Sequence, residues 1–196
     1  MRPHNAPSLT PETQPLPSSL GLLVLGLTML LLNLNGAGLF PLSTLVLGLA
    51  IMYGGVAQVL VGLLEWRHDN AFGCAAFTSL GLFWLSKIAM VVLPRTGFGQ
   101  APQASVMVTY LAMWGVFTFL LFLVTFKLNR GLQLIFGALS SHLLLQAVGF
   151  AGGGPIFHLV AAGIGIVAGV TAIYTAVTQG FSHAFTRSTA PLDEAR

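Results

Sequence analysis

Charged residues are scarce in this sequence. Asp, Glu, Lys and Arg make up 7% of the 196 residues, whereas 55% of the residues are hydrophobic. A soluble domain usually carries about 25% charged residues. Together with a mean hydropathy of +0.85, this shortage excludes an ordinary soluble domain. It predicts a polytopic membrane protein.

Patterns typical of enzymes and metal sites are also missing. The chain contains no P-loop, HExxH, CxxC or GxSxG sequence. Its five acidic residues lie in the tails or at the end of a hydrophobic segment, so no carboxylate pair is placed for acid–base catalysis inside the membrane. The five histidines lack metal-ligand spacing. We therefore expect no enzyme, no catalytic residues, no metal and no cofactor. No basic cluster with interleaved aromatic residues is present either, so we expect no binding of nucleic acid.

Six hydrophobic segments are long enough to cross a bilayer, which takes about 20 apolar residues per helix. Membrane β-strands would be shorter, about ten residues, and would alternate in polarity. The segments span roughly 19–34, 39–64, 71–93, 105–126, 131–150 and 155–180. The sequence predicts an all-α integral membrane protein with a six-helix transmembrane domain over 19–182. Flexible cytoplasmic tails are expected over 1–18 and 183–196.

The basic residues indicate how the chain is oriented. Six spans return both chain ends to one side of the membrane. That side holds most of the Lys and Arg, namely Arg2, Arg67, Lys127, Arg130, Arg187 and Arg196, whereas the other side holds Arg95. Because positively charged loops stay on the cytoplasmic side, we predict that the N and C termini are cytoplasmic. We expect the protein to lie in the inner (plasma) membrane of the cell.

A small set of polar side chains lies inside the spans. One interpretation is hydrogen bonding between helices; the other is a narrow, weakly polar path for a small solute. The candidates for such a path are Asn33, Gln58, Thr78 and Ser79. We expect the amides of Asn33 and Gln58 to be hydrogen-bonded, because an unpaired amide in hydrocarbon is costly. His142 and His158 are candidate proton relays, since histidine titrates near neutral pH.

Several stretches resemble the succinate–acetate permease (acetate uptake transporter) family, the YaaH/SatP type. They are "LLLNLNGAGLFPLS", "YGGVAQVLVGLLEWRHDNAFGCAAFTSLGLFWLS", "YLAMWGVFTFLLF" and "IYTAV". The resemblance covers residues from about 16 to 185. It implies six transmembrane helices per protomer and homohexamers in which each protomer has its own pore. It also implies uptake of acetate and related short monocarboxylates, with succinate in some members, linked to protons.

The chain departs from this family at two places. The family's first-span motif reads Asn-Pro-Ala-Pro-Leu-Gly-Leu, but residues 16–22 read "LPSSLGL". The family also has a hydrophobic constriction of Phe, Tyr and Leu, and the matching positions are Leu25, Leu80 and Leu139. The resemblance therefore implies an all-leucine neck without a hydroxyl group. Such a neck is compatible with a more apolar monocarboxylate or with the protonated form of the acid. It is also compatible with a substrate that differs from the family's.

Lys87 lies within the third span, where a charge is costly. It follows Leu80 by seven residues, so the two side chains share one helix face. If Leu80 lines the neck, Lys87 points into an outer vestibule and attracts carboxylates. Alternatively, the lysine faces lipid and extends to the headgroups.

Three functions therefore remain open at this point. The first is uptake of acetate and related carboxylates, proton-linked or channel-like. The second is a channel of the same fold for a small neutral solute such as urea, an amide or ammonia. The third is a membrane sensor or scaffold that transports nothing.

Overall fold

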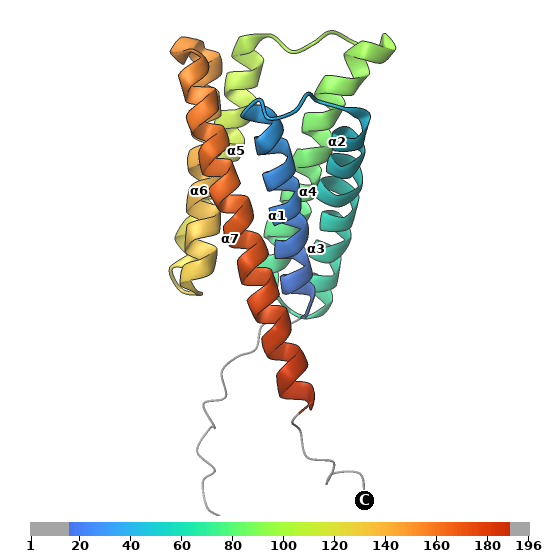
Figure 1. The fold of residues 1–196 in the computed structure, drawn as a ribbon, viewed down its shortest axis with the longest axis vertical. Helices are drawn as coiled ribbons and strands as arrows, with labels where there is room; N and C mark the ends of the chain where they lie inside the picture. Colours follow the sequence, from blue (N-terminus) through green and yellow to red (C-terminus); the bar gives the residue numbers. More distant parts are fainter. Residues whose placement is uncertain (1–15, 189–196) are drawn as a thin grey trace, which may run out of the picture.

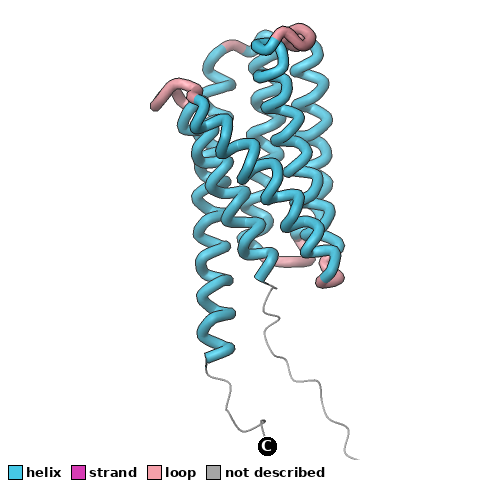
Figure 2. The backbone as a smooth tube through the Cα atoms, turned by 90° about the vertical axis from the view of Figure 1, so that its right-hand side faces the viewer, coloured by secondary structure: helices cyan, strands magenta, loops and turns pink. Residues whose placement is uncertain are grey.

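The computed structural model describes residues 16–188, and within them the side chains of residues 18–180. Helices account for nearly all of this part of the chain, and no strand occurs in it (Figures 1 and 2). The elements are α1 (Leu16–Gly36), α2 (Thr44–Leu49), η1 (Ala50–Ala57), α3 (Gln58–Arg67), α4 (Ala71–Val92), η2 (Leu93–Thr96), α5 (Ala104–Thr125), α6 (Arg130–Val148), η3 (Gly149–Gly153) and α7 (Pro155–Ser188).

Within residues 16–188, six helical segments are long and apolar enough to span a membrane, because α2, η1 and α3 join into one rod. The segments are Ser18–Gly36, Thr44–Arg67, Ala71–Thr96, Ala104–Thr125, Arg130–Gly153 and Pro155–Gly180. The predicted all-α fold with six transmembrane helices is confirmed. The tails predicted over 1–18 and 183–196 lie largely outside the described residues, although helix extends into both, from Leu16 and as far as Ser188.

Polar caps determine where several helices begin. The Ser43 side chain accepts a hydrogen bond from the Val46 N–H and starts α2. The second span was expected from about residue 39, but it begins at Thr44. Hydrophobicity placed this boundary too early, because Pro41 lacks an N–H and disfavours a helical residue before it. Asn129 starts α6 in the same way as Ser43 starts α2, by accepting from the Leu132 N–H at 2.9 Å.

Helices α1, α4 and α6 run in the same direction through the bundle, and the α2–α3 rod, α5 and α7 run back (Figure 1). We call the face where α1 begins and α7 ends the terminal face, and the other the opposite face. The main neighbours of α1, α4 and α6 are α7, α3 and α5, respectively. The parallel helices α1, α4 and α6 thus contact their antiparallel neighbours more than they contact one another. Large side chains fill the space between α1, α4 and α6.

The contact between α1 and α7 depends on small residues. A Cβ atom on Gly26 would collide with the Gly169 carbonyl oxygen and with Ile173. Close backbone approach through glycine is a common way for helices to associate in lipid. Gly26 and Gly169 therefore let the backbones of these two helices pack closely.

A buried carboxylate ties three helices together at the terminal face. Glu65 of α3 is fully buried. Its Oε1 accepts from Ser18 Oγ of α1 at 2.7 Å, and its Oε2 accepts from Asn70 Nδ2 at 2.6 Å. Asn70 caps α4, since its Oδ1 accepts the Gly73 N–H at 3.1 Å. Because this cap uses Oδ1, the Nδ2 group of Asn70 is the one that faces Glu65. The partial positive charge at the N-terminus of α4 further stabilises the carboxylate.

We predict that Ser18→Ala lowers the thermal stability of the protein in detergent. It removes one of the two hydrogen bonds to the Glu65 carboxylate, and a bond to a charged group contributes about 1.5–3 kcal/mol. The readout is the Tm in a thermal-shift assay, with a fall of several degrees expected. Ser141→Ala is the matched control, because the exposed Ser141 donates only within its own helix, to the Gly137 carbonyl. Equal Tm values for both variants would show that the carboxylate does not need Ser18.

Candidate functional site

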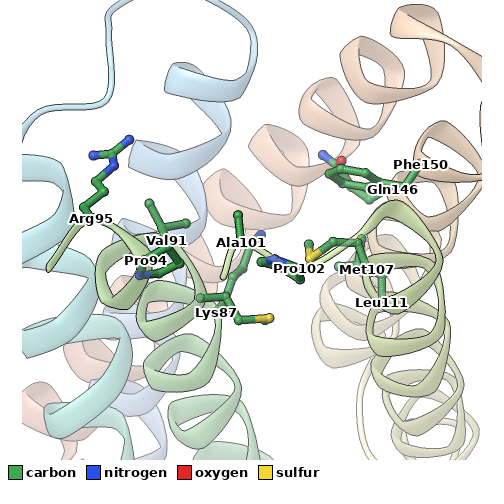
Figure 3. Close-up of a pocket in the computed structure, with 11 residues that line it drawn as sticks. Lys87, Val91, Pro94, Arg95, Ala101, Pro102, Met107, Leu111, Gln146 and Phe150 are labelled. Carbon is green, nitrogen blue, oxygen red and sulfur yellow. The ribbon is translucent and has the colours of Figure 1, made fainter. Parts of the chain in front are cut away.

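A cavity of about 520 Å³ lies near the opposite face of the bundle. Residues of α4, η2, α5, α6 and η3 line it, together with Ala101 and Pro102 from the loop before α5 (Figure 3). Most of the lining is apolar, and its polar residues are Lys87, Arg95 and Gln146. We call it the large cavity. Two cations and an amide on apolar walls are suited to holding a small anion.

A second cavity, of about 50 Å³, lies at the terminal face. It is formed by α1, α4 and α6 with the residues just before α4 and α6. Ser18 and Asn70 give it a polar side, and Leu22, Phe77 and Leu132 line its apolar side. We call it the small cavity. The Ser18–Glu65–Asn70 hydrogen bonds therefore lie directly beside it.

Leu25, Leu80 and Leu139 lie between the two cavities. Each is the tenth residue of its helix, in α1, α4 and α6 respectively. At 1.5 Å per residue, all three lie about 13 Å along helices that begin at the same face. Their exposed fractions are 1%, 0% and 1%, and they belong to one buried cluster. Their role as the neck of a pathway stays a prediction, but the fold places them at one depth.

The positions of other residues along the helices support this order. Leu22 and Phe77, on the small cavity, precede Leu25 and Leu80 by three residues. Lys87 and Gln146, on the large cavity, follow Leu80 and Leu139 by seven residues each. In α4 and α6 the sequence of features is therefore the same: small cavity, leucine, large cavity.

Lys87 lies against a cluster of aromatic rings. Its Nζ lies 5.1 Å from the ring centroid of Trp84 and 5.6 Å from that of Phe83. Phe83 in turn stacks on Tyr110 with centroids 5.8 Å apart. Such rings stabilise a cation that has left bulk water. The acidic residues among the described side chains are Glu65 and Asp69, both near the terminal face, so they are not available to pair with Lys87.

The two predicted amides differ from each other in their surroundings. Asn33 is 4% exposed, and its Nδ2 donates to the Met29 carbonyl at 2.7 Å. A Cβ on Gly165 would collide with that amide, so Asn33 lies at the contact of α1 with α7. Gln58 is fully buried, and neither end of its amide has a partner among the described residues. The expectation of hydrogen bonds is right for Asn33 and wrong for Gln58, because the helices around Gln58 use their backbone groups internally.

Thr78 and Ser79 are half-buried on α4, and neither is among the residues that line the two cavities. Thr78 lies against α3, since a Cβ on Gly62 would collide with it. Its hydroxyl is buried without a partner among the described residues. Their place on a path for solute stays a prediction.

The two histidines have well-defined partners. His142 is 2% exposed, and its Nδ1 lies 2.8 Å from the Ala161 carbonyl of α7, to which it donates. His158 Nδ1 lies 2.6 Å from Gln146 Oε1. Because Gln146 lines the large cavity, its amide connects His158 to that cavity. Neither proton role is tested by this geometry. Sequence reasoning did not select Gln146, although its spacing from Leu139 equals that of Lys87 from Leu80.

Comparison with known proteins gives consistent matches. The chain is 42% identical to the succinate-acetate/proton symporter SatP of Escherichia coli K12 over 179 residues, which is 91% of this chain and 95% of that one. It is 32% identical to ammonia transport outward protein 2 of Saccharomyces cerevisiae over 69% of this chain and 51% of the relative. The chain thus spans about half the length of that yeast protein.

Solved structures and family models agree with these relatives. The structure of the bacterial acetate channel SatP matches with a TM-score of 0.85 and 40% identity, over 90% of this chain and 98% of that one. The model of the GPR1/FUN34/yaaH family matches residues 3–191. The chain therefore belongs to the GPR1/FUN34/yaaH family.

Proposed function

We propose that this protein carries acetate and related short monocarboxylates, and succinate as a further substrate, across the cell membrane. The observation that carries the proposal is the arrangement of two cavities separated by one layer of leucines, in a chain 42% identical to a succinate-acetate/proton symporter. On this proposal the protein is a transporter or channel and not an enzyme.

The charges support a direction for the pathway. Arg67, Lys127 and Arg130 lie at the ends of helices on the terminal face, and Arg95 lies at the other end. Because positive residues stay on the cytoplasmic side, we assign the terminal face to the cytoplasm of an inner (plasma) membrane protein. The large cavity then opens to the outside, where Lys87 and Arg95 attract carboxylates from the medium.

The leucine layer favours passage of the neutral acid. A carboxylate that enters an apolar neck loses its hydration without gaining a hydrogen bond, which is costly. Protonation of the carboxylate removes its charge and most of this desolvation cost. On this proposal, transport is therefore linked to protons. His142 and His158 are the candidate relays, and Gln58, whose amide is unpartnered, is the best candidate among the predicted polar residues to contact the solute.

Assembly into homohexamers with one pathway per protomer is also part of the proposal. Many large apolar side chains lie exposed on the outer faces of the helices, such as Leu60, Met113, Leu134 and Val167. Lipid and neighbouring protomers are the two partners that cover such faces in a membrane.

A channel for ammonia or another small neutral solute is the second candidate. Two observations favour it: the yeast relative named for outward ammonia transport, and the apolar side chains of Leu25, Leu80 and Leu139 at one depth in the bundle. An apolar layer admits small uncharged molecules, and it admits ammonia more readily than urea or an amide, which loses more hydrogen bonds to water.

Flux into proteoliposomes separates the two candidates. We expect radiolabelled acetate to accumulate under an inward proton gradient and propionate to compete with it. Ammonia flux is followed in the same vesicles by an internal pH dye. Ammonia or urea flux without acetate flux would support the second candidate, and absence of every flux would contradict both.

The neck leads to a first prediction for transport. Leu80→Tyr narrows the leucine layer and adds a hydroxyl, so uptake should shift toward acetate over longer monocarboxylates, by several-fold in the ratio of initial rates. Leu82→Tyr is the matched control, since Leu82 lies on the same helix but is 52% exposed. If the substrate profile is unchanged at equal protein level, Leu80 does not line the pathway.

A second prediction concerns Lys87. Lys87→Met should raise the apparent KM for acetate about fivefold at low salt, since one unit charge at 4 Å in water contributes about 1 kcal/mol. The effect should shrink at high salt because ions screen it, and Lys87→Arg should behave almost as wild type. Lys127→Met, at the other end of the bundle, is the control. A wild-type KM for Lys87→Met at every ionic strength would mean that the lysine faces lipid.

A further inference from the structure

Lys87 and Gln146 occupy equivalent places on two parallel helices. Each is the seventeenth residue of its helix, in α4 and α6 respectively, and each lines the large cavity. Figure 3 draws them on different walls of that cavity, with Gln146 beside Phe150. A carboxylate between them would meet an ammonium group on one side and an amide on the other.

His158 contacts the side-chain amide of Gln146. Gln146 Oε1 lies 2.6 Å from His158 Nδ1. The imidazole is itself packed in place: a Cβ on Gly149 would collide with it, and the Phe150 ring meets it edge-on at 4.8 Å. No described residue pairs with Gln146 Nε2. With Oε1 held by the histidine, both N–H groups of Nε2 remain for a ligand in the cavity.

Which end of the amide faces the cavity depends on the protons of His158. A ring with hydrogen on Nδ1 donates to Oε1 and leaves Nε2 as a donor for the cavity. A ring without that hydrogen accepts from Nε2, and the amide then turns Oε1 toward the cavity, where it repels a carboxylate. The imidazolium ion carries hydrogen on both nitrogens, so it permits the first arrangement alone.

We propose that His158 is a positioning residue that orients the Gln146 amide, and that Lys87 Nζ and Gln146 Nε2 together bind a carboxylate in the large cavity when His158 is protonated. This rests on the proposed function and deepens it. The proton and the carboxylate then bind together before the solute reaches the leucine layer. By linkage, each favours the binding of the other.

The charges around the site favour this coupling. Toward this end of the bundle, the titratable groups on the elements around His158 and the cavity are Lys87 on α4, Arg95 on η2, Tyr110 on α5 and His142 on α6. Further titratable side chains on these elements, Cys74, Arg130 and Tyr174, lie toward the terminal face. None of them is acidic, so no protein carboxylate competes with Gln146 for the His158 proton. The cations make the empty cavity electropositive, and a bound carboxylate neutralises that charge and favours the added proton.

Isothermal titration of acetate into the purified full-length protein tests the proposal. Titrations in buffers of different ionisation enthalpy give the number of protons taken up with each acetate. We expect wild type to take up protons on binding and to bind more tightly at pH 5.5 than at pH 7. His158→Gln should still bind acetate, but with the proton uptake and the pH dependence lost. His68→Gln, in an exposed turn at the terminal face, is the control that keeps both.

Substitution of Gln146 tests the other half of the site. Gln146→Leu should weaken acetate binding by about tenfold or more, since it removes a hydrogen bond to a charged group, one of the stronger kinds. Gln146→Glu keeps an acceptor for His158 while placing a negative charge at the cavity, so it should bind acetate more weakly still. Size-exclusion profiles check that each variant is folded.

The outcomes separate this inference from the proposed function. Acetate binding with unchanged proton uptake in His158→Gln, or with wild-type affinity in both Gln146 variants, would overturn the inference alone. Wild-type protein that binds neither acetate nor propionate at any pH would overturn the proposed function as well.

Discussion

Hydrocarbon provides neither hydrogen-bond partners nor counter-ions, and the arrangement of polar groups in this protein follows from that constraint. Many hydroxyl groups in the spans are satisfied within their own helix, as when Thr28 donates to the Val24 carbonyl. The stronger polar groups gather near the two faces. Glu65 is surrounded by donors near the terminal face, whereas Lys87 and Gln146 line the large cavity near the opposite face. Leu25, Leu80 and Leu139 lie between them. The buried amide of Gln58 is the exception, since it lies about 13 Å from the terminal face, as deep as the leucines.

This separation explains how a protein with few charges can handle an anion. On the proposed function, Lys87 and Arg95 concentrate carboxylates in the large cavity, while the leucine layer selects against charge. On that proposal the solute binds as an anion and passes the leucines as a neutral acid, after it has taken up a proton. Glu65 contributes at the other end by holding α1, α3 and α4 together beside the small cavity.

The six spans and the helical fold could be predicted from the sequence, because length and hydrophobicity determine them. The family resemblance marks Leu25, Leu80 and Leu139, and the fold places them at one depth, but their role as a neck stays a prediction. The pairing of Gln146 with His158 could not be predicted, because it depends on how α6 and α7 are rotated against each other. Likewise, nothing in the sequence indicates that Gln58 lacks a partner, since that depends on which groups of neighbouring helices face it.

The central claim is that two cavities open to opposite sides of the membrane and that a leucine layer separates them. Thiol labelling tests it most directly, in a background where the sole cysteine is changed by Cys74→Ala. Val91→Cys, in the large cavity, should react with a membrane-impermeant reagent added outside intact cells. Leu128→Cys, at the rim of the small cavity and 46% exposed, should react only in inside-out vesicles. Labelling of both positions from the same side would contradict the account.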